Sequence, residues 1–404
     1  MLGTHRRGLP CQQIQAGRGT GFMPANGRKI TYAASNLLSY HNAAVVCIME
    51  MCSALAKVNA QTTLCVPACD SSKESLFNYY GVESPFDILE IPLPRFCYSG
   101  KVPGRAVLYS FLASLKLAGK DTGIVYSREP WLIFMLSVIF KRPCIYESHQ
   151  FRFKGRLQTC LYRNMVRRSV ATGLVKVVCI SNVLKDYWMK DGIPADKLFV
   201  LHDAVNMNKY RLDVTREQAR NMLGIDGSKP MIVYTGSLLP GKGVDVLLRC
   251  ANRLTGLSFV IVGGEKDEIA RLGGMVRGDN VRFTGKIPPS RVPLFQAAAD
   301  VLALPNTMGS VIDDVTSPVK LFEYFAAGHP VVATDIPSLL EVLRHNHNAL
   351  ISAAGDDCAM AEHIEFLIAN PDVGKALVEN AKQELENYTW ERRAEQILTL
   401  CKPI

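Results

Sequence analysis

Apolar residues follow two patterns along this chain, and the two patterns alternate. Short continuous apolar runs predict buried strands, and longer segments with apolar residues every three or four positions predict helices, for instance residues 43–58 and 182–191. Strands and helices that alternate in this way form a parallel sheet with helices on both faces. The predicted strands are residues 30–34, 62–66, 87–91, 123–127, 143–147, 175–180, 198–201, 231–235, 258–262, 281–284, 301–304, 330–333 and 349–352.

The predicted strands fall into two series. The first lies in residues 29–205 and the second in residues 206–388, and a polar stretch with a short predicted helix, residues 206–227, is the expected linker. Each series makes a complete doubly wound α/β unit, and such sheets bind ligands at the carboxyl ends of their strands. The sequence therefore predicts two Rossmann-like domains that face each other across a cleft, followed by a terminal helix within residues 389–404.

The composition is that of a globular protein. A chain of 404 residues can bury two cores, and a hydrophobic content of 48% with a charged content of 21% is typical of a soluble protein. The longest apolar run, residues 131–140, is too short to span a membrane and is expected to be a buried or interfacial helix. The N-terminus has no apolar signal-peptide core and the twelve cysteines are scattered, which predicts reduced thiols and a cytoplasmic location.

The net charge of +9 is concentrated in two segments. Residues 1–29 carry five Lys or Arg and no acid, and their low periodicity predicts a disordered basic lead-in over residues 1–28. Residues 141–168 carry eight Lys or Arg against Glu147, interleaved with apolar and aromatic residues. Such a segment suits an anionic surface, which predicts peripheral binding to the inner face of a membrane. A solvated basic helix is the alternative, and no nucleic-acid-binding motif accompanies the charge.

One stretch in the second series combines helix signals with an unexpected charge. Ser317 suits a helix N-cap, Pro318 the first helical position and Gly328 the end. Where a capping box would carry Glu or Gln, this helix has Lys320, beside the positive end of its dipole. A lysine at this position is repelled by the helix dipole, and a bound anion would remove this unfavourable interaction. Glu323, one turn further on, suits sugar hydroxyls, so the pair predicts a nucleotide-sugar site; a plain surface Lys–Glu pair is the alternative.

A glycine-rich turn follows the first strand of the second series. Gly236 and Ser237 lie in this turn, and Lys242 precedes the next helix. The spacing is not that of a P-loop, because Gly243 follows the lysine where Ser or Thr would be needed. Glycines here let the backbone approach a ligand, and Lys242 together with Lys320 would match a diphosphate. A packing turn is the alternative.

Further candidates lie at other strand ends. Gly264 and Lys286 follow the next two strands and could line a nucleobase pocket, although tight turns explain them as well. His149 ends a strand of the first series, where it would face the cleft and bond a sugar hydroxyl or phosphate, or serve as a core histidine. His41 and Arg128 are candidates for contacts with an acceptor. His, Cys and Asp do not cluster at metal-ligand spacing, so no bound metal ion is expected.

These motifs together resemble those of the retaining GT-B nucleotide-sugar glycosyltransferases, the large "glycosyl transferases group 1" type, over about residues 29–404. The likeness is clearest in residues 236–354. The residues that carry it are the Gly236 turn with Lys242, the segment from Ser317 to Ala333, the pair Glu147 and His149, and Thr389-Trp390-Glu391 at the terminal helix.

The resemblance also implies roles for these residues. Lys242 would bind the donor diphosphate and Glu323 the ribose hydroxyls. Backbone N–H groups near Val319 and Lys320 would bind the phosphates, and His149 would touch the sugar near the reacting centre. The resemblance implies no permanently bound cofactor, only the nucleotide sugar as donor substrate.

Two positions depart from the family pattern. Many relatives carry an arginine just after the turn glycine, and this chain has Ser237 there. Many also carry a second glutamate before the donor helix, and the matching position here is Val315, with Asp313 and Asp314 beside it. Diphosphate binding would then depend on Lys242 and helix N-termini.

The sequence therefore predicts a hexosyltransferase that needs no metal ion. It would move a hexose from a nucleoside-diphosphate sugar to a hydroxyl of a glycan, lipid-linked or small-molecule acceptor, with the anomeric configuration retained. Two alternatives remain: a nucleotide-sugar epimerase of the same fold and a non-catalytic nucleotide-binding protein.

Overall fold

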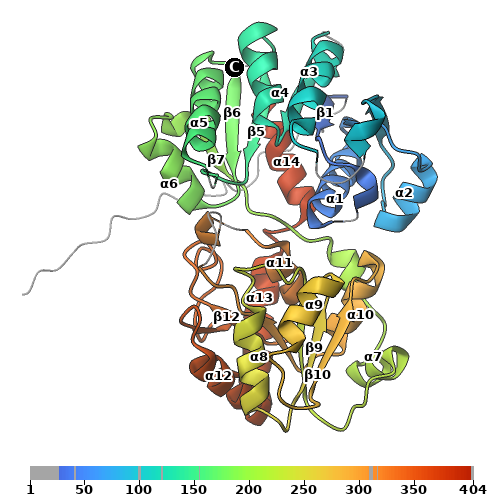
Figure 1. The fold of residues 1–404 in the computed structure, drawn as a ribbon, viewed down its shortest axis with the longest axis vertical. Helices are drawn as coiled ribbons and strands as arrows, with labels where there is room; N and C mark the ends of the chain where they lie inside the picture. The colour runs from blue at the N-terminus through green and yellow to red at the C-terminus, as the bar shows by residue number, and fades with distance from the viewer. Residues whose placement is uncertain are drawn as a thin grey trace, which may run out of the picture.

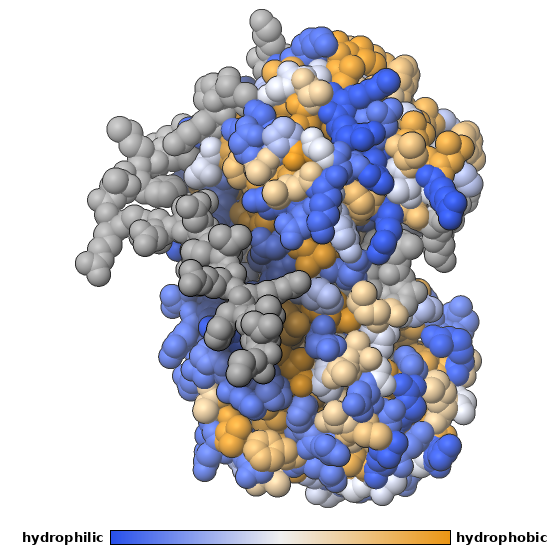
Figure 2. Space-filling model, turned by 90° about the vertical axis from the view of Figure 1, so that its left-hand side faces the viewer, coloured by the Kyte–Doolittle hydropathy of each residue, from blue (hydrophilic) through white to orange (hydrophobic). Residues whose placement is uncertain are grey.

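The computed structural model describes residues 27–40, 42–98, 102–119, 122–153, 155–308, 313–315 and 317–401. These residues form two α/β domains stacked along the long axis of the molecule, with a waist between them (Figure 1, Figure 2). Each domain has one parallel sheet with helices on both faces, as the apolar pattern predicts. All the predicted strands are present, and each begins and ends within one residue of its predicted bounds.

The N-terminal sheet has seven strands in the order β3-β2-β1-β4-β5-β6-β7, so the strand order reverses between β1 and β4. Its strands are β1 (Lys29–Ala33), β2 (Gln61–Pro67), β3 (Asp87–Ile91), β4 (Ile124–Ser127), β5 (Cys144–Ser148), β6 (Val175–Cys179) and β7 (Leu198–Val200). One face is covered by α1 (Ala43–Lys57), α2 (Lys73–Tyr80) and the terminal helix α14 (Trp390–Leu400). The other face is covered by α3 (Arg105–Leu117), α4 (Pro130–Phe134) with its π-helical extension η4 (Met135–Ile139), α5 (Arg156–Ala171) and α6 (Asn182–Lys190).

The C-terminal sheet has six strands in the order β10-β9-β8-β11-β12-β13. Its strands are β8 (Met231–Thr235), β9 (Ser258–Val262), β10 (Val281–Gly285), β11 (Val301–Leu304), β12 (Val331–Thr334) and β13 (Leu350–Ser352). The helices on one face are α7 (Arg216–Leu223), α10 (Val292–Ala297), α11 (Val319–Ala327) and α13 (Pro371–Leu385). Those on the other are α8 (Val244–Arg253), α9 (Lys266–Gly273) and α12 (Asp357–Ala369).

The chain crosses between the domains twice, and the two crossings lie side by side. The first leaves β7 and passes through the 3₁₀-helix η6 (Met207–Tyr210), and the second returns to α14. Val205 and Thr389 join the two crossings in a β-bridge. Beyond η6, α7 places Ala219 and Leu223 in the C-terminal core. The prediction of a linker over residues 206–227 is therefore wrong in its second half, because the apolar face of α7 is buried.

The described cysteines are all free, and most of them are buried. Burial raises the pKa of Cys65 and Cys401 to about 11, so these thiols stay protonated near neutral pH. Within the described ranges, no helix combines the length and the hydrophobicity that crossing a bilayer requires.

Candidate functional site

The helix α11 begins one residue later than predicted. Its N-cap is Pro318, to which no described side chain adds a capping bond, and Val319 is the first helical residue. The hydroxyl of Ser317 instead accepts the backbone N–H of Asp203 at 3.0 Å. The prediction that Ser317 caps the helix is wrong, because its hydroxyl joins this loop to the segment after β7. The first turn of α11 thus offers backbone N–H groups without a capping side chain from the described residues, an arrangement that favours an anion.

Lys320 lies in this first turn, against the end of β8. Its Nζ donates to the hydroxyl of Tyr234 at 2.9 Å and lies 4.2 Å from the centre of that ring. A Cβ added to Gly236 would lie 3.0 Å from the same Nζ. Burial lowers the pKa of Lys320 well below its usual value, the charge of Lys242 lowers it further, and Glu323 opposes both. The structure thus brings Lys320, Lys242 and Gly236 together at the carboxyl end of β8.

The turns after β8 and β9 pack so closely that a side chain would not fit. A Cβ on Gly263 would lie 2.1 Å from the carbonyl oxygen of Gly236, and one on Gly243 would lie 1.6 Å from that of Pro305. The three glycines all have positive φ angles. The loop that carries Lys242 into α8 is therefore fixed against the ends of β9 and β11.

Glu323 follows Lys320 by one turn and faces a cavity between the two domains. Its carboxylate is hydrogen-bonded to Tyr210 of η6 and Gln296 of α10. Burial raises the pKa of Glu323, and the bond from Tyr210 and the charge of Lys320 offset part of the rise. The cavity has a volume of about 330 Å³ and is lined by both domains, with Glu50, Tyr79 and Glu83 on one side and Ser290, Val319 and Glu323 on the other.

Three other predicted donor residues lie elsewhere in this region. A Cβ on Gly264 would lie 2.3 Å from Cδ1 of Leu238, so the packing turn accounts for this glycine. Ser237 is exposed in the turn after β8. The side chain of Lys286 is 59% exposed and pairs with Glu265 at the surface. These contacts explain Gly264 and Lys286 without a ligand.

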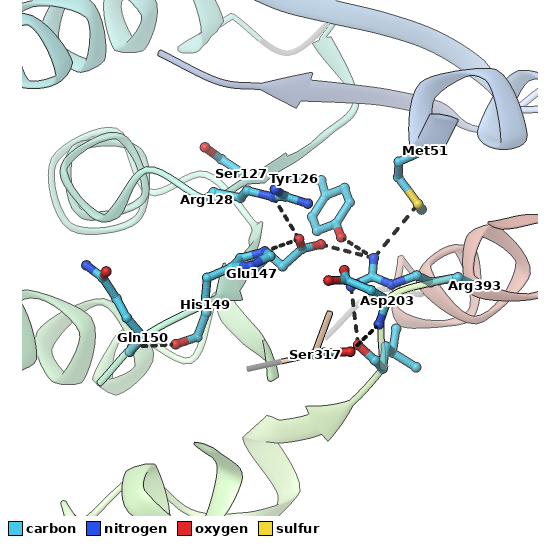
Figure 3. Close-up of polar contacts among 12 residues, drawn as sticks. Met51, Tyr126, Ser127, Arg128, Glu147, His149, Gln150, Asp203, Ser317 and Arg393 are labelled. Carbon is cyan, nitrogen blue, oxygen red and sulfur yellow. Dashed lines mark hydrogen bonds and ion pairs between the residues drawn. The ribbon is translucent and has the colours of Figure 1, made fainter. Parts of the chain in front are cut away.

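A second group of polar residues lies at the carboxyl end of β5 in the N-terminal domain (Figure 3). From Oε1 of the buried Glu147, Nε2 of His149 lies at 2.5 Å and Nε of Arg128 at 2.8 Å. Nη1 of Arg393 lies 3.1 Å from Oε2. Burial alone would raise the pKa of Glu147, but Arg393 and His149 bring it below its usual value, so the carboxylate is ionised.

The residues predicted for the N-terminal side of the cleft have three different positions. His149 lies at the end of β5 as predicted, with 29% of its side chain exposed. The side chain of Arg128 is 15% exposed and pairs with Glu147. It therefore lies against the Glu147 carboxylate and does not face solvent. His41 lies outside the described residues.

Sequence reasoning missed Arg393, which comes from the terminal helix. Its side chain is 3% exposed and lies among the buried residues of α14, which include Trp390, Ala394 and Ile397. A cation on the apolar stripe of a helix usually has a buried partner, and that signal could have identified it.

The position at which the resemblance implies a glutamate also has a structural explanation. Val315 is buried in the core of the N-terminal domain, and its carbonyl oxygen accepts the hydroxyl of Ser181. Asp314 pairs with Arg152 and accepts the hydroxyl of Tyr187. This loop of the C-terminal domain therefore binds the other domain.

Comparisons with known proteins show which proteins the chain is similar to. The family model described as Glycosyl transferases group 1 matches residues 215–384. The GDP-mannose-dependent alpha-(1-6)-phosphatidylinositol monomannoside mannosyltransferase of Mycobacterium tuberculosis is 28% identical over 226 residues, which are 53% of this chain and 58% of that protein. The D-inositol 3-phosphate glycosyltransferase of Corynebacterium urealyticum is 30% identical over 226 residues, 52% of this chain and 51% of that one. The chain thus spans little more than half the length of these relatives.

The whole fold has a solved counterpart. The crystal structure of HepE from Anabaena in complex with UDP and glucose superposes with a TM-score of 0.70 at 16% identity, and the match covers 92% of this chain and 99% of that one. At this level of identity the likeness shows a common arrangement of both domains.

Proposed function

We propose that the protein is a hexosyltransferase that uses a nucleoside-diphosphate sugar, since residues 215–384 match the Glycosyl transferases group 1 family model in a chain with the GT-B fold. One observation carries the proposal. Lys320, Lys242 and the start of α11 meet at the carboxyl end of β8. Two cations and a helix N-terminus at one point suit a diphosphate, whose charge grows as the sugar leaves.

Each of these groups has a part in binding the donor. Lys242, Lys320 and the N–H groups of α11 hold the diphosphate, and Glu323 accepts hydrogen bonds from the ribose hydroxyls. The cavity beside Glu323 receives the nucleoside end, between walls from both domains. His149, across the cleft, contacts the sugar. The two domains together exclude water from the reacting bond.

In the transfer step, the bond from the anomeric carbon to the diphosphate oxygen breaks while the acceptor oxygen bonds to that carbon. The proton of the acceptor hydroxyl passes to the leaving diphosphate on the same face of the sugar, so the anomeric configuration is retained. Among the described residues no group of three or more His, Cys, Asp or Glu could hold a metal ion. Metal-free stabilisation of the diphosphate by lysines and helix dipole is part of the proposal.

Replacing Lys242 or Glu323 by alanine tests the proposal. A thermal-shift screen of UDP-, GDP- and ADP-sugars first identifies the donor, since one relative above is named for GDP-mannose and the solved structure contains UDP. We expect each variant to lose transfer by about 100-fold or more while remaining folded, because each removes a group that binds the donor. Lys375→Ala, in an exposed pair with Asp372 on the same domain, should keep wild-type rates.

Wild-type rates in both Lys242→Ala and Glu323→Ala would contradict the assignment. NMR coupling constants of the product report whether the configuration is retained. Conversion of the nucleotide sugar without any acceptor would show an epimerase instead, and tight nucleotide binding without turnover would show a binding protein.

We further propose that the N-terminal domain binds the anionic inner face of a membrane from the cytoplasm, through α3, η4 and α5. These three elements are neighbours on one face of the sheet. In Figure 2, apolar side chains gather at the upper end of this domain. The exposed large apolar residues on these elements are Val107, Phe111, Leu115, Ile139, Leu157 and Leu161. A charged surface with apolar residues that can enter the headgroup layer suits such a membrane.

The part of the basic segment that can face a membrane is smaller than predicted. Several cations of residues 141–168 are held by the protein itself: Arg142 donates to the Gly123 carbonyl oxygen, Arg152 pairs with Asp314, and Arg163 and Arg167 pair with Asp191. Lys141, Arg156 and Arg168 are exposed. Tyr162, Met165 and Val166 lie in the core, which leaves Leu157 and Leu161 as the outward apolar residues of α5.

Vesicle flotation tests the membrane proposal. We expect the protein to float with phosphatidylglycerol-containing vesicles at low salt and to be released at high salt, because exposed charges are screened. The double variant Leu157→Glu/Leu161→Glu should lose binding, whereas Phe366→Glu, at an exposed site of the C-terminal domain, should keep it. No flotation at low salt, or equal flotation of both variants, would contradict the proposal.

A further inference from the structure

Glu147 and Arg393 take no direct part in the transfer described above, yet they form a buried ion pair. Their exposed fractions are 1% and 3%, and 246 positions of sequence separate them. A buried pair of this kind is often no more stabilising than apolar residues of similar volume. The pair is better explained by the group that Glu147 holds in place.

We propose that Glu147 fixes His149 in the tautomer with its proton on Nε2, and that Arg393 of the terminal helix holds Glu147 in position for this. His149 then presents Nδ1 as a hydrogen-bond acceptor for a hydroxyl of the bound sugar. Glu147 and Arg393 are positioning residues in this scheme. The sugar contact rests on the proposed function, whereas the tautomer does not.

The contact between Glu147 and His149 decides which ring nitrogen carries the proton. Nε2 of His149 lies 2.5 Å from Oε1 of Glu147. Two guanidinium groups, those of Arg128 and Arg393, face the same carboxylate and keep it ionised. An ionised carboxylate can only accept, so Nε2 must donate, and in the neutral ring the lone pair is then on Nδ1. The His149 side chain is 29% exposed, so a ligand can reach the ring.

Arg393 is suited to hold Glu147 because its whole guanidinium group is bound. Besides Glu147, Nη1 donates to the hydroxyl of Tyr126 at 2.8 Å. Nε donates to the carbonyl oxygen of His202 at 2.9 Å, and Nη2 to that of Leu201 at 3.3 Å. These partners belong to β4 and to the segment after β7, and Figure 3 shows Tyr126 and Glu147 beside the guanidinium group. A planar group bonded on several sides has one orientation, and lysine could not replace these contacts.

NMR of the full-length protein with ¹⁵N-labelled histidine tests the tautomer directly, because protonated and unprotonated ring nitrogens differ in chemical shift. His149 is assigned by comparison with His149→Asn. For the neutral ring in the wild type, we expect the Nε2–H pattern for His149. In Glu147→Gln we expect this pattern to be lost to a mixture of the two tautomers, because no carboxylate holds the proton. An Nδ1–H pattern in the wild type, or an unchanged pattern in Glu147→Gln, would overturn the proposal.

The same spectra contain a matched control. Nε2 of His202 lies 2.8 Å from Oε2 of Glu341, in a second carboxylate–histidine pair. Glu341→Gln should change the signal of His202 and leave that of His149 as in the wild type. If Glu147→Gln does not fold, Arg393→Gln gives a second reading, with the Nδ1–H form of His149 expected to increase. An unchanged His149 pattern in Arg393→Gln would show that Arg393 is not needed to position Glu147.

Kinetics separate this inference from the proposed function. With the donor found by the thermal-shift screen, Glu147→Gln should lower kcat by about 100-fold and leave the nucleotide dissociation constant unchanged, because the diphosphate site is intact. The spectra require no substrate. A correct tautomer in a protein without transferase activity would therefore refute only the proposed function, and an altered tautomer with wild-type kcat would refute the sugar contact of His149.

Discussion

Burial and ligand binding are expected to shift the pKa of Lys320 in opposite directions. Burial and the charge of Lys242 lower the pKa of Lys320 well below its usual value. A diphosphate beside the ammonium group would favour the charged form and raise that pKa again. Nucleotide binding is therefore linked to proton uptake at pH values between the pKa of Lys320 in the free protein and its higher pKa in the complex.

We expect nucleotide affinity to fall as the pH rises from the pKa of Lys320 in the free protein to its pKa in the complex, by up to about tenfold per pH unit. Below the lower of these values Lys320 is charged in both states, and the linkage vanishes. Calorimetry in two buffers of different ionisation enthalpy measures the proton uptake. Lys320→Met should abolish the uptake and Lys375→Met should preserve it. Equal uptake by Lys320→Met and the wild type would assign the proton to another group.

The residues of the candidate site could be predicted from the sequence only where their neighbours in the chain carry the signal. Lys320 is detectable because a lysine in the first turn of a helix conflicts with the dipole at that position. Arg393 and Glu147 carry no such local signal, since 246 positions separate them and their contact depends on the path of the terminal helix. The use of Ser317 likewise depends on Asp203, 114 positions away.

At the scale of elements, the strands could be predicted because each is a short apolar run covered on both faces. The segments Met231–Thr235 and Ser258–Val262 match their predicted bounds at both ends, and most of their side chains are buried. A short apolar run of this kind is buried in a globular protein most easily as a strand of a sheet that is covered on both faces. The start of α11 could not be predicted as well, because Ser and Pro both suit the first positions of a helix and a distant backbone group decides between them.

The sequence of elements also leaves open which domain a helix joins. The terminal helix follows the C-terminal domain along the chain, but in the structure it lies beside α1 of the N-terminal domain (Figure 1). The sequence predicts where this helix lies in the chain, but it does not predict which domain the helix packs against. The partner follows from its apolar face, which fits the gap left on that side of the N-terminal sheet.

For the whole molecule, this placement means that the N-terminal domain is incomplete without the last residues of the chain. Trp390, Ala394, Ile397 and Leu398 are buried in the same cluster as the residues of α1. Arg28, just before the first strand, donates to the carbonyl oxygen of Leu398 at 2.7 Å. The two ends of the described chain therefore stabilise one domain, and the C-terminal domain is an insertion between them in spatial terms.

Ile397→Ala should therefore loosen the N-terminal domain and spare the C-terminal one. Ile397 is fully buried, so its truncation should cost about 2–5 kcal/mol, through lost burial and the cavity that remains. Hydrogen–deuterium exchange resolved by peptide should show faster exchange in α1 and β2. Ile364→Ala, the same change at an equally buried site of α12, should speed exchange in the C-terminal domain instead. Faster exchange confined to residues 231–385 in Ile397→Ala would show that the terminal helix is energetically part of the C-terminal domain, contrary to its packing.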